Sequence, residues 1–448
     1  MNERDSETIA GLLEQMGYAA APEQESADVL LMNTCSVREN ADNRFFGLLG
    51  RLKHIKVERP DVIVGVCGCM MQQDHIVEQI KEKHAWVDII FGTHNIDAVP
   101  ELIEDVLNER KISKQKSAKG PTAQILNERA ELIEGLPAKR EFSYKASVNI
   151  MYGCNNYCTY CIVPYTRGRE ISRNAEDILS EIKNLTASGT KEILLLGQNV
   201  NSYSDIREQN SDIREQNKTD FADLVTMVDA VPGVERIRFM TSHPKDLSDK
   251  LIEKFSKEGG NGARHLCPSI HLPIQSGSTR VLEIMNRRYT KDNYIELVRK
   301  LREVRPEIVI STDFIVGFPG ETEEDFEHTM DVIERVRFDA AFTFLYSARK
   351  GTPAADFEDN TPDDVKQMRF DRMVKRLNEI TLEINKTYVG TVHDVLVEGP
   401  SKTTPKMLQG RTFGNKLVNF PAGGEATGEI VKVRITTVRT FSFIGEII

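Results

Sequence analysis

Cys154-Asn155-Asn156-Tyr157-Cys158-Thr159-Tyr160-Cys161 is the stretch that says most about this 448-residue chain. Three cysteines within eight residues, placed directly after a predicted strand, can hold one metal centre in a single loop. A structural zinc site normally takes four Cys or His ligands, and no fourth lies nearby in the sequence. Three thiolates suit a [4Fe–4S] cluster with one open iron. The spacing therefore predicts an iron–sulfur centre, against the alternatives of unrelated cysteines or a zinc site completed by a distant ligand.

A series of six predicted strands starts just before this stretch and alternates with helices. The strands are predicted at Ser147–Tyr152, Glu192–Leu196, Arg236–Thr241, Ser269–Ile274, Val309–Val316 and Ala341–Tyr346. The helices are predicted at Ala175–Ala187, Phe221–Val231, Leu247–Ser256, Lys291–Val304 and Glu323–Val336. Six β/α units predict a parallel, TIM-like barrel or part of one over residues 142–375. Reactive groups of such barrels gather at the carboxyl ends of the strands.

Residues 1–110 also alternate between helix and strand, which predicts a Rossmann-like α/β domain. Its strands are predicted at Val29–Met32, Val62–Val66 and Ile89–Phe91, and its helices at Asp5–Gly17, Val37–Lys56, from Gln72 and at Ile96–Glu109. The chain opens directly on a helix, whereas such a domain normally begins with a strand. The polar, basic and breaker-rich segment 111–141 is predicted to be a linker.

The pattern changes again at the C-terminal end. Strands are predicted at Thr391–Val397, Met407–Arg411, Lys416–Phe420, Gly428–Ile435 and Thr440–Ile447. They predict a small OB-like β-barrel over 377–448, an architecture that often binds nucleic acid. From Tyr388 on, seven Lys and Arg face five Asp and Glu, so this module carries +2 in a chain of net charge −10. Its phenylalanines can stack on bases or fill the core of the barrel. We expect at least two of them to fill the core; the four are Phe413, Phe420, Phe441 and Phe443.

Composition excludes several protein classes. With 40% apolar and 28% charged residues, the chain is neither collagen-like nor wholly disordered. No apolar run approaches the roughly 18 residues that a membrane span needs. The charged N-terminus is unlike a signal peptide, so we expect a cytoplasmic protein without a membrane partner. In that compartment disulfides are rare, and the seven cysteines point to metal binding or catalysis.

Two further cysteines each follow a predicted strand of the N-terminal domain. Cys35 and Cys69 lie where α/β sheets place their ligands, and the alternative is a pair of buried thiols. Cys67, two residues before Cys69, is expected to point to the opposite side of an extended strand and to lie in the core. Cys267 has no cysteine near it in sequence and is interpreted as a packed thiol.

The C-x-x-x-C-x-x-C spacing, with an aromatic residue before the last cysteine and six β/α units behind it, resembles the radical S-adenosylmethionine (SAM) superfamily. The order of an α/β domain, this core and a small barrel is similar to the methylthiotransferase family, whose barrel is called TRAM. Matching stretches cover nearly the whole chain: Cys161–Arg169, Leu196–Tyr203, His271–Gly277, Met285–Thr290 and Thr312–Thr322. Gly410–Phe420 is most similar to the branch that acts on isopentenylated adenosine in tRNA.

This resemblance implies two [4Fe–4S] clusters and SAM as cofactors. Cys154, Cys158 and Cys161 would hold the catalytic cluster, and Cys35 and Cys69 would ligate an auxiliary one. Gln275, Ser276 and Gly197 would line the cavity for SAM and substrate. The implied partners are the anticodon loop of tRNA and an electron donor such as flavodoxin or ferredoxin. Arg167, Arg169 and Arg173 are expected either to meet tRNA phosphates or to form a solvated basic loop.

One departure concerns the auxiliary cluster. The family's amino-terminal motif reads Gly-Cys-Gln-Met-Asn-x-x-Asp-Ser-Glu, and Met1–Glu7 starts inside it. The first strand and the first auxiliary cysteine are therefore expected to be missing, which leaves that cluster incompletely ligated.

Three other hypotheses remain open on sequence. A sibling enzyme would act on threonylcarbamoyl-adenosine in tRNA or on an aspartate of a ribosomal protein. From a different class, the chain would be a non-catalytic Fe–S RNA-binding protein.

The heptad Ser204–Asn210, repeated as Ser211–Asn217, is interpreted as a duplication in a surface loop.

Overall fold

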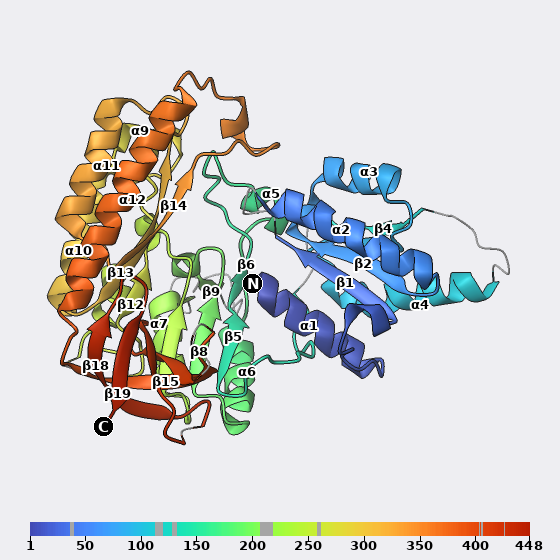
Figure 1. Ribbon diagram of the computed structural model, residues 1–448, viewed down its shortest axis with the longest axis horizontal. Helices are drawn as coiled ribbons and strands as arrows, with labels where there is room; N and C mark the ends of the chain where they lie inside the picture. The colour runs from blue at the N-terminus through green and yellow to red at the C-terminus, as the bar shows by residue number, and fades with distance from the viewer. Residues whose placement is uncertain are drawn as a thin grey trace, which may run out of the picture. The chain divides into compact units, whose positions relative to one another are not determined.

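Figure 1 shows a computed structural model of the chain, which describes residues 1–35, 40–112, 120–127, 132–206, 218–257, 261–402, 404, 406–424 and 426–448. The described residues form two compact units. The first comprises Met1–Glu141, Tyr152–Asn155 and Cys161–Ile171, and the second comprises Phe142–Met151, Asn156–Tyr160 and Ser172–Ile448. Most of the duplicated heptad, at 207–217, lies outside the described residues. The strands on either side of it, β9 (Ser204–Ile206) and β10 (Lys218–Asp220), pair antiparallel.

The first unit contains a four-stranded parallel sheet in the order β1-β2-β3-β4. The strands are β1 (Val29–Thr34), β2 (Ile63–Gly68), β3 (Ile89–Phe91) and β4 (Thr122–Gln124). The helices are α1 (Asn2–Gln15), α2 (Asn40–Glu58), α3 (Asp74–Lys83), α4 (Val99–Ile112) and the short α5 (Val163–Arg167). Helix α1 begins at the second residue, and among the described strands β1 pairs only with β2. The predicted α/β domain that opens on a helix is thus confirmed.

Alternating side chains of β2 separate two apolar layers. Ile63 and Cys67 pack with α1 and α4, whereas Val66 packs with α2 and α3 on the opposite face. This alternation follows from the two-residue period of a strand. Cys67 is fully buried in the first layer, so its thiol belongs to the core, as predicted.

The expectation that Cys67 points to the opposite side from Cys69 is wrong in its reasoning. Residues two apart on a strand share a face, so extended backbone alone would leave the two thiols on the same side. Strand β2 ends at Gly68, whose φ of +98° turns the chain, and Cys69 already belongs to a short 3-10 helix. The two thiols stay within electrostatic reach of each other, because the charge of Cys69 adds to the rise in the pKa of the Cys67 thiol that burial causes.

The segment 111–141 contains more structure than a linker. Its residues Thr122–Gln124 form β4, which adds a parallel strand to β3 in register with Ile89–Phe91. Further on, the amide of Lys139 donates to the carbonyl of Glu7 at 2.9 Å. Pairing of β4 satisfies backbone groups of β3 that an edge would leave exposed. Thr122–Gln124 has no apolar run like that of Ile89–Phe91, so the sequence predicts no strand there.

The second unit holds the six predicted core strands. They form two parallel three-stranded sheets, β11-β8-β5 and β12-β13-β14. The strands are β5 (Lys145–Asn149), β8 (Glu192–Leu196), β11 (Arg236–Phe239), β12 (Ser269–His271), β13 (Val309–Val316) and β14 (Ala340–Leu345). A parallel bridge between Ile237 and Leu266 links the two sheets. The partial β/α barrel is therefore confirmed. Two-residue strands β6 (Met151–Tyr152) and β7 (Ile171–Ser172) flank the cysteine loop in sequence.

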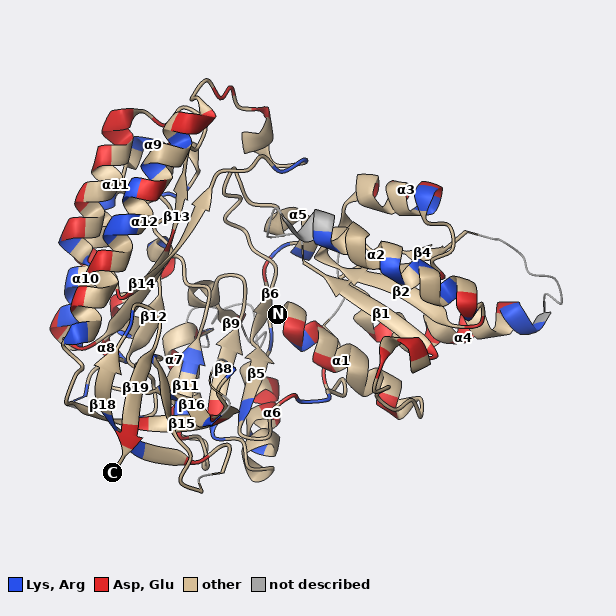
Figure 2. Cartoon of the chain, in the orientation of Figure 1, with Lys and Arg blue, Asp and Glu red and all other residues tan. Residues whose placement is uncertain are grey.

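Six of the seven helices described in the second unit begin at a residue whose side chain caps the backbone, and the last one does not. The seven are α6 (Ala175–Ala187), α7 (Phe221–Asp229), α8 (Asp249–Glu253), α9 (Thr279–Ile284), α10 (Lys291–Val304), α11 (Glu323–Val336) and α12 (Asp363–Lys386). Thr290 and Thr322 each accept a hydrogen bond from the backbone three residues on, in reciprocal capping boxes. Figure 2 shows basic and acidic residues interspersed along α10, α11 and α12, where ion pairs such as Arg376–Glu334 join neighbouring helices.

Helix α12 has no counterpart among the predicted elements. It runs unbroken for 24 residues and carries Met373, Leu377 and Ile380 into the main core. The predicted boundary between 375 and 377 therefore falls inside a continuous helix. Dense charge on its other faces hides the narrow apolar stripe in the sequence.

The C-terminal strands close into a barrel in the order β15-β16-β17-β19-β18. They are β15 (Val392–Pro400), β16 (Met407–Thr412), β17 (Leu417–Pro421), β18 (Ile430–Val438) and β19 (Phe443–Ile447). Phe420 and Phe443 fill its core, whereas the side chain of Phe441 is 77% exposed. The predicted five-stranded barrel is confirmed, with two phenylalanines inside it as expected. No helix in the described part of the chain is long and apolar enough to cross a membrane.

Candidate functional site

The cysteine loop begins in a tight turn of the first unit. Gly153 has φ of +70°, and a Cβ there would lie 1.9 Å from the carbonyl oxygen of Arg169. The amide of Cys154 donates to the carbonyl of Gly168 at 3.1 Å. Only glycine allows this close backbone approach, which fixes where Cys154 enters the loop.

The middle of the loop is held by the second unit. The side-chain amide of Asn286 donates to the carbonyls of Asn156 and Tyr157 at 3.1 and 3.0 Å. The amide of Thr159 donates to the carbonyl of Met285 at 3.1 Å. Asn286 has φ of +57°, a left-handed conformation that asparagine tolerates better than most residues. The backbone around Cys158 is thus clamped on both sides.

Arg287 lies against Cys158 and was given no role by the sequence. Its Nη1 donates to Cys158 Sγ at 3.5 Å, and its Nε donates to the hydroxyl of Tyr289 at 2.9 Å. The side chain is buried. The sequence did contain a signal, because Arg287 lies in Met285–Thr290, one of the stretches that matched the family.

The donor set of the loop fits an iron–sulfur cluster. Cys154 and Cys158 are buried and Cys161 is partly exposed. Within the described ranges, no three His, Cys, Asp or Glu side chains are gathered in a geometry ready for a metal ion. The fit therefore rests on donor chemistry, since three cysteine sulfurs within one loop are the ligands that hold such clusters.

Cys35 and Cys69 follow neighbouring parallel strands, whose last residues Thr34 and Gly68 are paired. Burial raises the pKa of the Cys69 thiol, and the charge of Cys35 adds to that rise, so the two sulfurs lie within electrostatic reach. The described residues thus supply two thiols here, which do not complete a three-cysteine set.

A buried ion pair supports Cys69. Arg167 Nε donates to Cys69 Sγ at 3.1 Å, and Arg167 Nη2 lies 2.7 Å from a carboxylate oxygen of Asp5. The guanidinium opposes the rise in the pKa of the Cys69 thiol that burial causes. Arg167 is therefore committed to the protein interior, which corrects the expectation that it either meets tRNA phosphate or lies in a solvated basic loop.

Arg173 is corrected in the same way. Its Nη1 lies 2.8 Å from the Glu181 carboxylate and donates to the carbonyl of Asn149 at 2.6 Å. Of the three arginines that follow the cysteine loop, only Arg169 is exposed. Spacing to the cysteines could not show this, because burial depends on which distant carboxylates each guanidinium meets.

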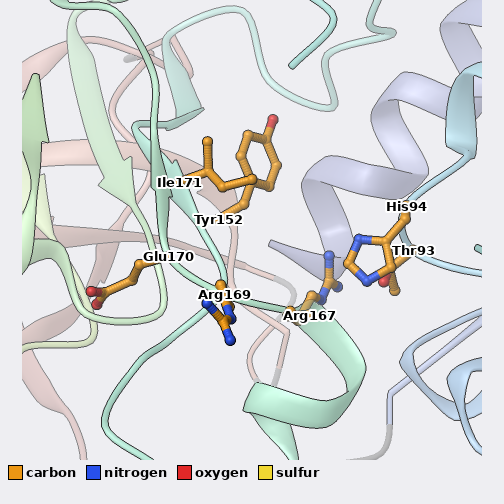
Figure 3. Close-up of a pocket in the computed structure, with 8 residues that line it drawn as sticks. Thr93, His94, Tyr152, Arg167, Arg169, Glu170 and Ile171 are labelled. Carbon is orange, nitrogen blue, oxygen red and sulfur yellow. The ribbon is translucent and has the colours of Figure 1, made fainter. Parts of the chain in front are cut away.

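A cavity of about 270 Å³ lies beside Arg167 in the first unit (Figure 3). Its lining residues are Thr93, His94, Tyr152, Arg167, Gly168, Arg169, Glu170 and Ile171. Figure 3 shows Arg167 next to His94 and Thr93, with Tyr152 and Ile171 across from them. The cavity adjoins the Cys69 group and has room for a small polar molecule.

Polar atoms without a partner collect at the carboxyl ends of two core strands. Asn199 Oδ1 follows β8, and Ser242 Oγ and His243 Nε2 follow β11; within the described ranges each is buried without a hydrogen-bond partner. Burial lowers the pKa of His243, so its imidazole is neutral at pH 7. Buried polar groups normally have partners, so these atoms fit a polar ligand at the strand ends. Sequence reasoning did not single them out, although all three closely follow predicted strands.

The predicted SAM-lining residues lie in the same unit. Gln275 and Ser276 are both buried just beyond β12, and Gln275 adopts φ of +74°. A Cβ on Gly197 would lie 2.6 Å from Cγ of Met151. Close packing thus accounts for glycine at 197, whereas the roles of Gln275 and Ser276 stay predictions. Cys267 is buried, and burial raises its pKa to about 11, in line with a packed thiol.

The C-terminal barrel is bonded to the core through two arginines of β11. Arg236 donates to the carbonyls of Arg411 and Asp394 at 2.9 and 3.0 Å. Arg238 donates to those of Thr412 and Phe413 at 3.0 and 3.1 Å. The barrel is therefore a fixed part of the second unit.

Family models match three parts of the chain. They are the Radical SAM superfamily at residues 148–333, the Uncharacterized protein family UPF0004 at 1–92 and the TRAM domain at 386–448. Among solved structures, a radical S-adenosylmethionine methyltransferase, TsrM, from Kitasatospora setae is similar in fold. It has a TM-score of 0.54 and 15% sequence identity, over 78% of this chain and 70% of that chain.

Sequence relatives match from end to end. The tRNA-2-methylthio-N(6)-dimethylallyladenosine synthases of Alkaliphilus oremlandii and Acetivibrio thermocellus are each 50% identical over 448 residues. The alignments cover 100% of this chain and 90% and 89% of those proteins. The synthase of Clostridium botulinum is 50% identical over 446 residues and is covered to 94%. This chain belongs to the family of the tRNA-2-methylthio-N(6)-dimethylallyladenosine synthases, within the radical SAM superfamily.

Proposed function

We propose that this chain converts N(6)-dimethylallyladenosine to 2-methylthio-N(6)-dimethylallyladenosine beside the anticodon of tRNA. The observation that carries the proposal is the Cys154–Cys161 loop, which follows the first strand of a six-stranded β/α core. The end-to-end similarity to synthases of that name supports the substrate and the product.

Each part of the core has a role in this proposal. Cys154, Cys158 and Cys161 hold the [4Fe–4S] cluster, and Gln275 and Ser276 line the SAM cavity. When bound, the cluster and SAM would supply the radical chemistry that removes the hydrogen from C2 of adenine. The buried side chains around Cys158 would exclude water from the site, which is the protein's part in chemistry that the cofactors perform.

Cys35 and Cys69 supply two thiolates toward an auxiliary cluster. Arg167, fixed by Asp5, donates to the sulfur of Cys69 and lowers the cost of holding it as a thiolate. No step of the reaction is assigned to this pair, because the described residues hold only two of the three ligands.

The substrate is an anticodon loop, because the unstacked bases of a single-stranded loop can enter a pocket where a duplex cannot. The C-terminal barrel, with its exposed Phe441, offers a surface for RNA. The electron that the cluster needs comes from a small donor such as flavodoxin or ferredoxin. We place the reaction in the cytoplasm, where tRNA is modified.

Nucleoside analysis of tRNA tests the proposal. A strain that lacks its own synthase accumulates N(6)-dimethylallyladenosine, and expression of this chain should convert that nucleoside to its 2-methylthio form. The Cys158→Ala variant is the control and should leave the nucleoside unconverted. Appearance of methylthiolated threonylcarbamoyl-adenosine, or of a modified ribosomal-protein aspartate, would instead identify a sibling activity. No new product, together with retained tRNA binding, would indicate a non-catalytic RNA-binding protein.

A further inference from the structure

Arg287 occupies an unusual environment for a buried cation. Besides Cys158 and Tyr289, its guanidinium donates to the carbonyl of Pro273 at 2.8 Å and to the hydroxyl of Tyr160 at 3.4 Å. Its side chain is only 5% exposed. All three of its nitrogens are thus used, yet three of the four acceptors are uncharged oxygens.

The other buried arginines differ from Arg287 in one respect. The structure describes six arginines with buried side chains, and five of them have a carboxylate within 4 Å. The pairs are Arg167 with Asp5, Arg173 with Glu181, Arg236 and Arg238 with Glu192, and Arg369 with Glu321 and Glu323. Across the part of the chain that the structure describes, no carboxylate lies within that distance of Arg287.

A buried cation without a counter-charge is costly, so the structure needs an anion at this point. Burial raises the pKa of Tyr289 to about 12, and this phenol is therefore neutral at pH 7. The neighbours of Arg287 that can carry negative charge are the phenols of Tyr289 and Tyr160 and the sulfur of Cys158, and of these the sulfur is a thiolate whenever it ligates iron.

We propose that Arg287 is the counter-cation of the iron–sulfur cluster held by Cys158, and that its charge and its N–H···S bond raise the reduction potential of that cluster. The inference rests on the proposed function, because it assumes a cluster on Cys154, Cys158 and Cys161. Hydrogen bonds to the sulfurs and local charge both set the potentials of such clusters. The reduced cluster carries one more negative charge than the oxidised one, so an adjacent cation favours reduction. Arg287 acts through Cys158 and is a positioning residue.

Arg288 provides a matched control. It is the same residue type, next in the chain, exposed, and bonded to the side chain of Asn286. Arg287→Gln removes the charge and keeps a hydrogen-bonding side chain, whereas Arg287→Lys keeps the charge and loses the planar fork.

The experiment is an EPR-monitored redox titration of the full chain, reconstituted anaerobically and reduced with titanium(III) citrate. The titration follows the EPR signal that changes when SAM is added, which belongs to the cluster on Cys154, Cys158 and Cys161. Arg287→Gln should lower the reduced-to-oxidised ratio at a fixed potential at least tenfold, a negative shift of about 59 mV for one electron. Arg287→Lys should shift the reduction potential by less than half as much, and Arg288→Gln should leave the potential unchanged.

An Arg287→Gln protein with wild-type iron content and an unchanged potential would overturn the proposal. If this variant fails to hold iron, Arg287→Lys decides. An Arg287→Lys variant with a full cluster and a near-wild-type potential supports the role of charge. Loss of iron from the lysine variant as well would overturn it, because only the hydrogen bonds of the guanidinium to the protein would then matter. No tRNA takes part in the titration, so its result is independent of which substrate the enzyme modifies. Absence of any SAM-perturbed signal in the wild-type chain would refute the proposed function itself.

Discussion

Replacing Arg238 by methionine should loosen the C-terminal barrel from the core. Arg238 Nε lies 2.9 Å from the Glu192 carboxylate, and its Nη atoms donate to two carbonyls of the barrel, those of Thr412 and Phe413. The substitution leaves Glu192 buried with only Arg236, at 3.9 Å. Removing one partner of a buried ion pair costs about 3–5 kcal/mol, because the other charge stays desolvated.

Hydrogen–deuterium exchange of the β16–β17 hairpin measures this loss. Its amides exchange when the barrel opens or detaches, and each 1.4 kcal/mol is a factor of ten in that equilibrium. Arg238→Met should therefore speed exchange by roughly 100- to 3,000-fold. Lys432→Ala is the control on the same barrel. Its ion pair with Asp394 is more than half exposed on both sides and is worth less than about 1 kcal/mol.

The double variant Glu192→Leu/Arg238→Leu should regain only part of the protection, because it removes the unpaired Glu192 carboxylate but leaves the buried Arg236 without a carboxylate within 4 Å among the described residues. Exchange in Arg238→Met within about fivefold of the wild type would refute the reasoning. The same contacts argue that RNA binding by the barrel is better tested by surface substitutions than by deleting Tyr388–Ile448, which would expose Arg236 and Arg238.

Three further outcomes are expected. Cys158→Ala should abolish 5′-deoxyadenosine formation in the presence of a reductant, and normal formation in the reconstituted variant would contradict the assigned ligand. Burial raises the pKa of Glu321 from 4.5 to about 7, so the folded state binds its proton more tightly than the unfolded state. The free energy of unfolding should thus fall by roughly 3 kcal/mol as pH rises from about 4.5 to about 7. The melting temperature of Glu321→Gln should therefore depend less on pH than that of the wild type, and an equal pH dependence would disprove this role of Glu321. Gly68→Ala should destabilise the first unit by about 1–3 kcal/mol, because Gly68 has φ of +98° and a Cβ would lie 2.3 Å from the carbonyl oxygen of Thr34. The exposed helical Gly47→Ala should instead be neutral or stabilising, and equal melting temperatures for the two variants would contradict this reasoning.

Local patterns accounted for the elements of the core. The predicted strands Glu192–Leu196 and Val309–Val316 have the bounds of β8 and β13, and the predicted helix Lys291–Val304 has those of α10. Hydrophobic period and capping residues act over a few positions, so they can be recognised in the sequence. The same reasoning missed β4 and α12, whose stability comes from the sheet and core that they pack against.

The cysteine spacing likewise predicted a cluster loop without any knowledge of the fold, because three ligands within eight residues need no distant partner. The surroundings of the sulfurs could not be predicted in this way. Arg167 meets Cys69 across 98 residues, and Arg287 meets Cys158 across 129. Arg287 and Arg288 are identical neighbours in the sequence, yet one is buried against a sulfur and the other is exposed. Which of them becomes the buried cation depends on the backbone turn at Asn286 and on packing against Pro273 and Tyr289, and those contacts exist only once the chain has folded.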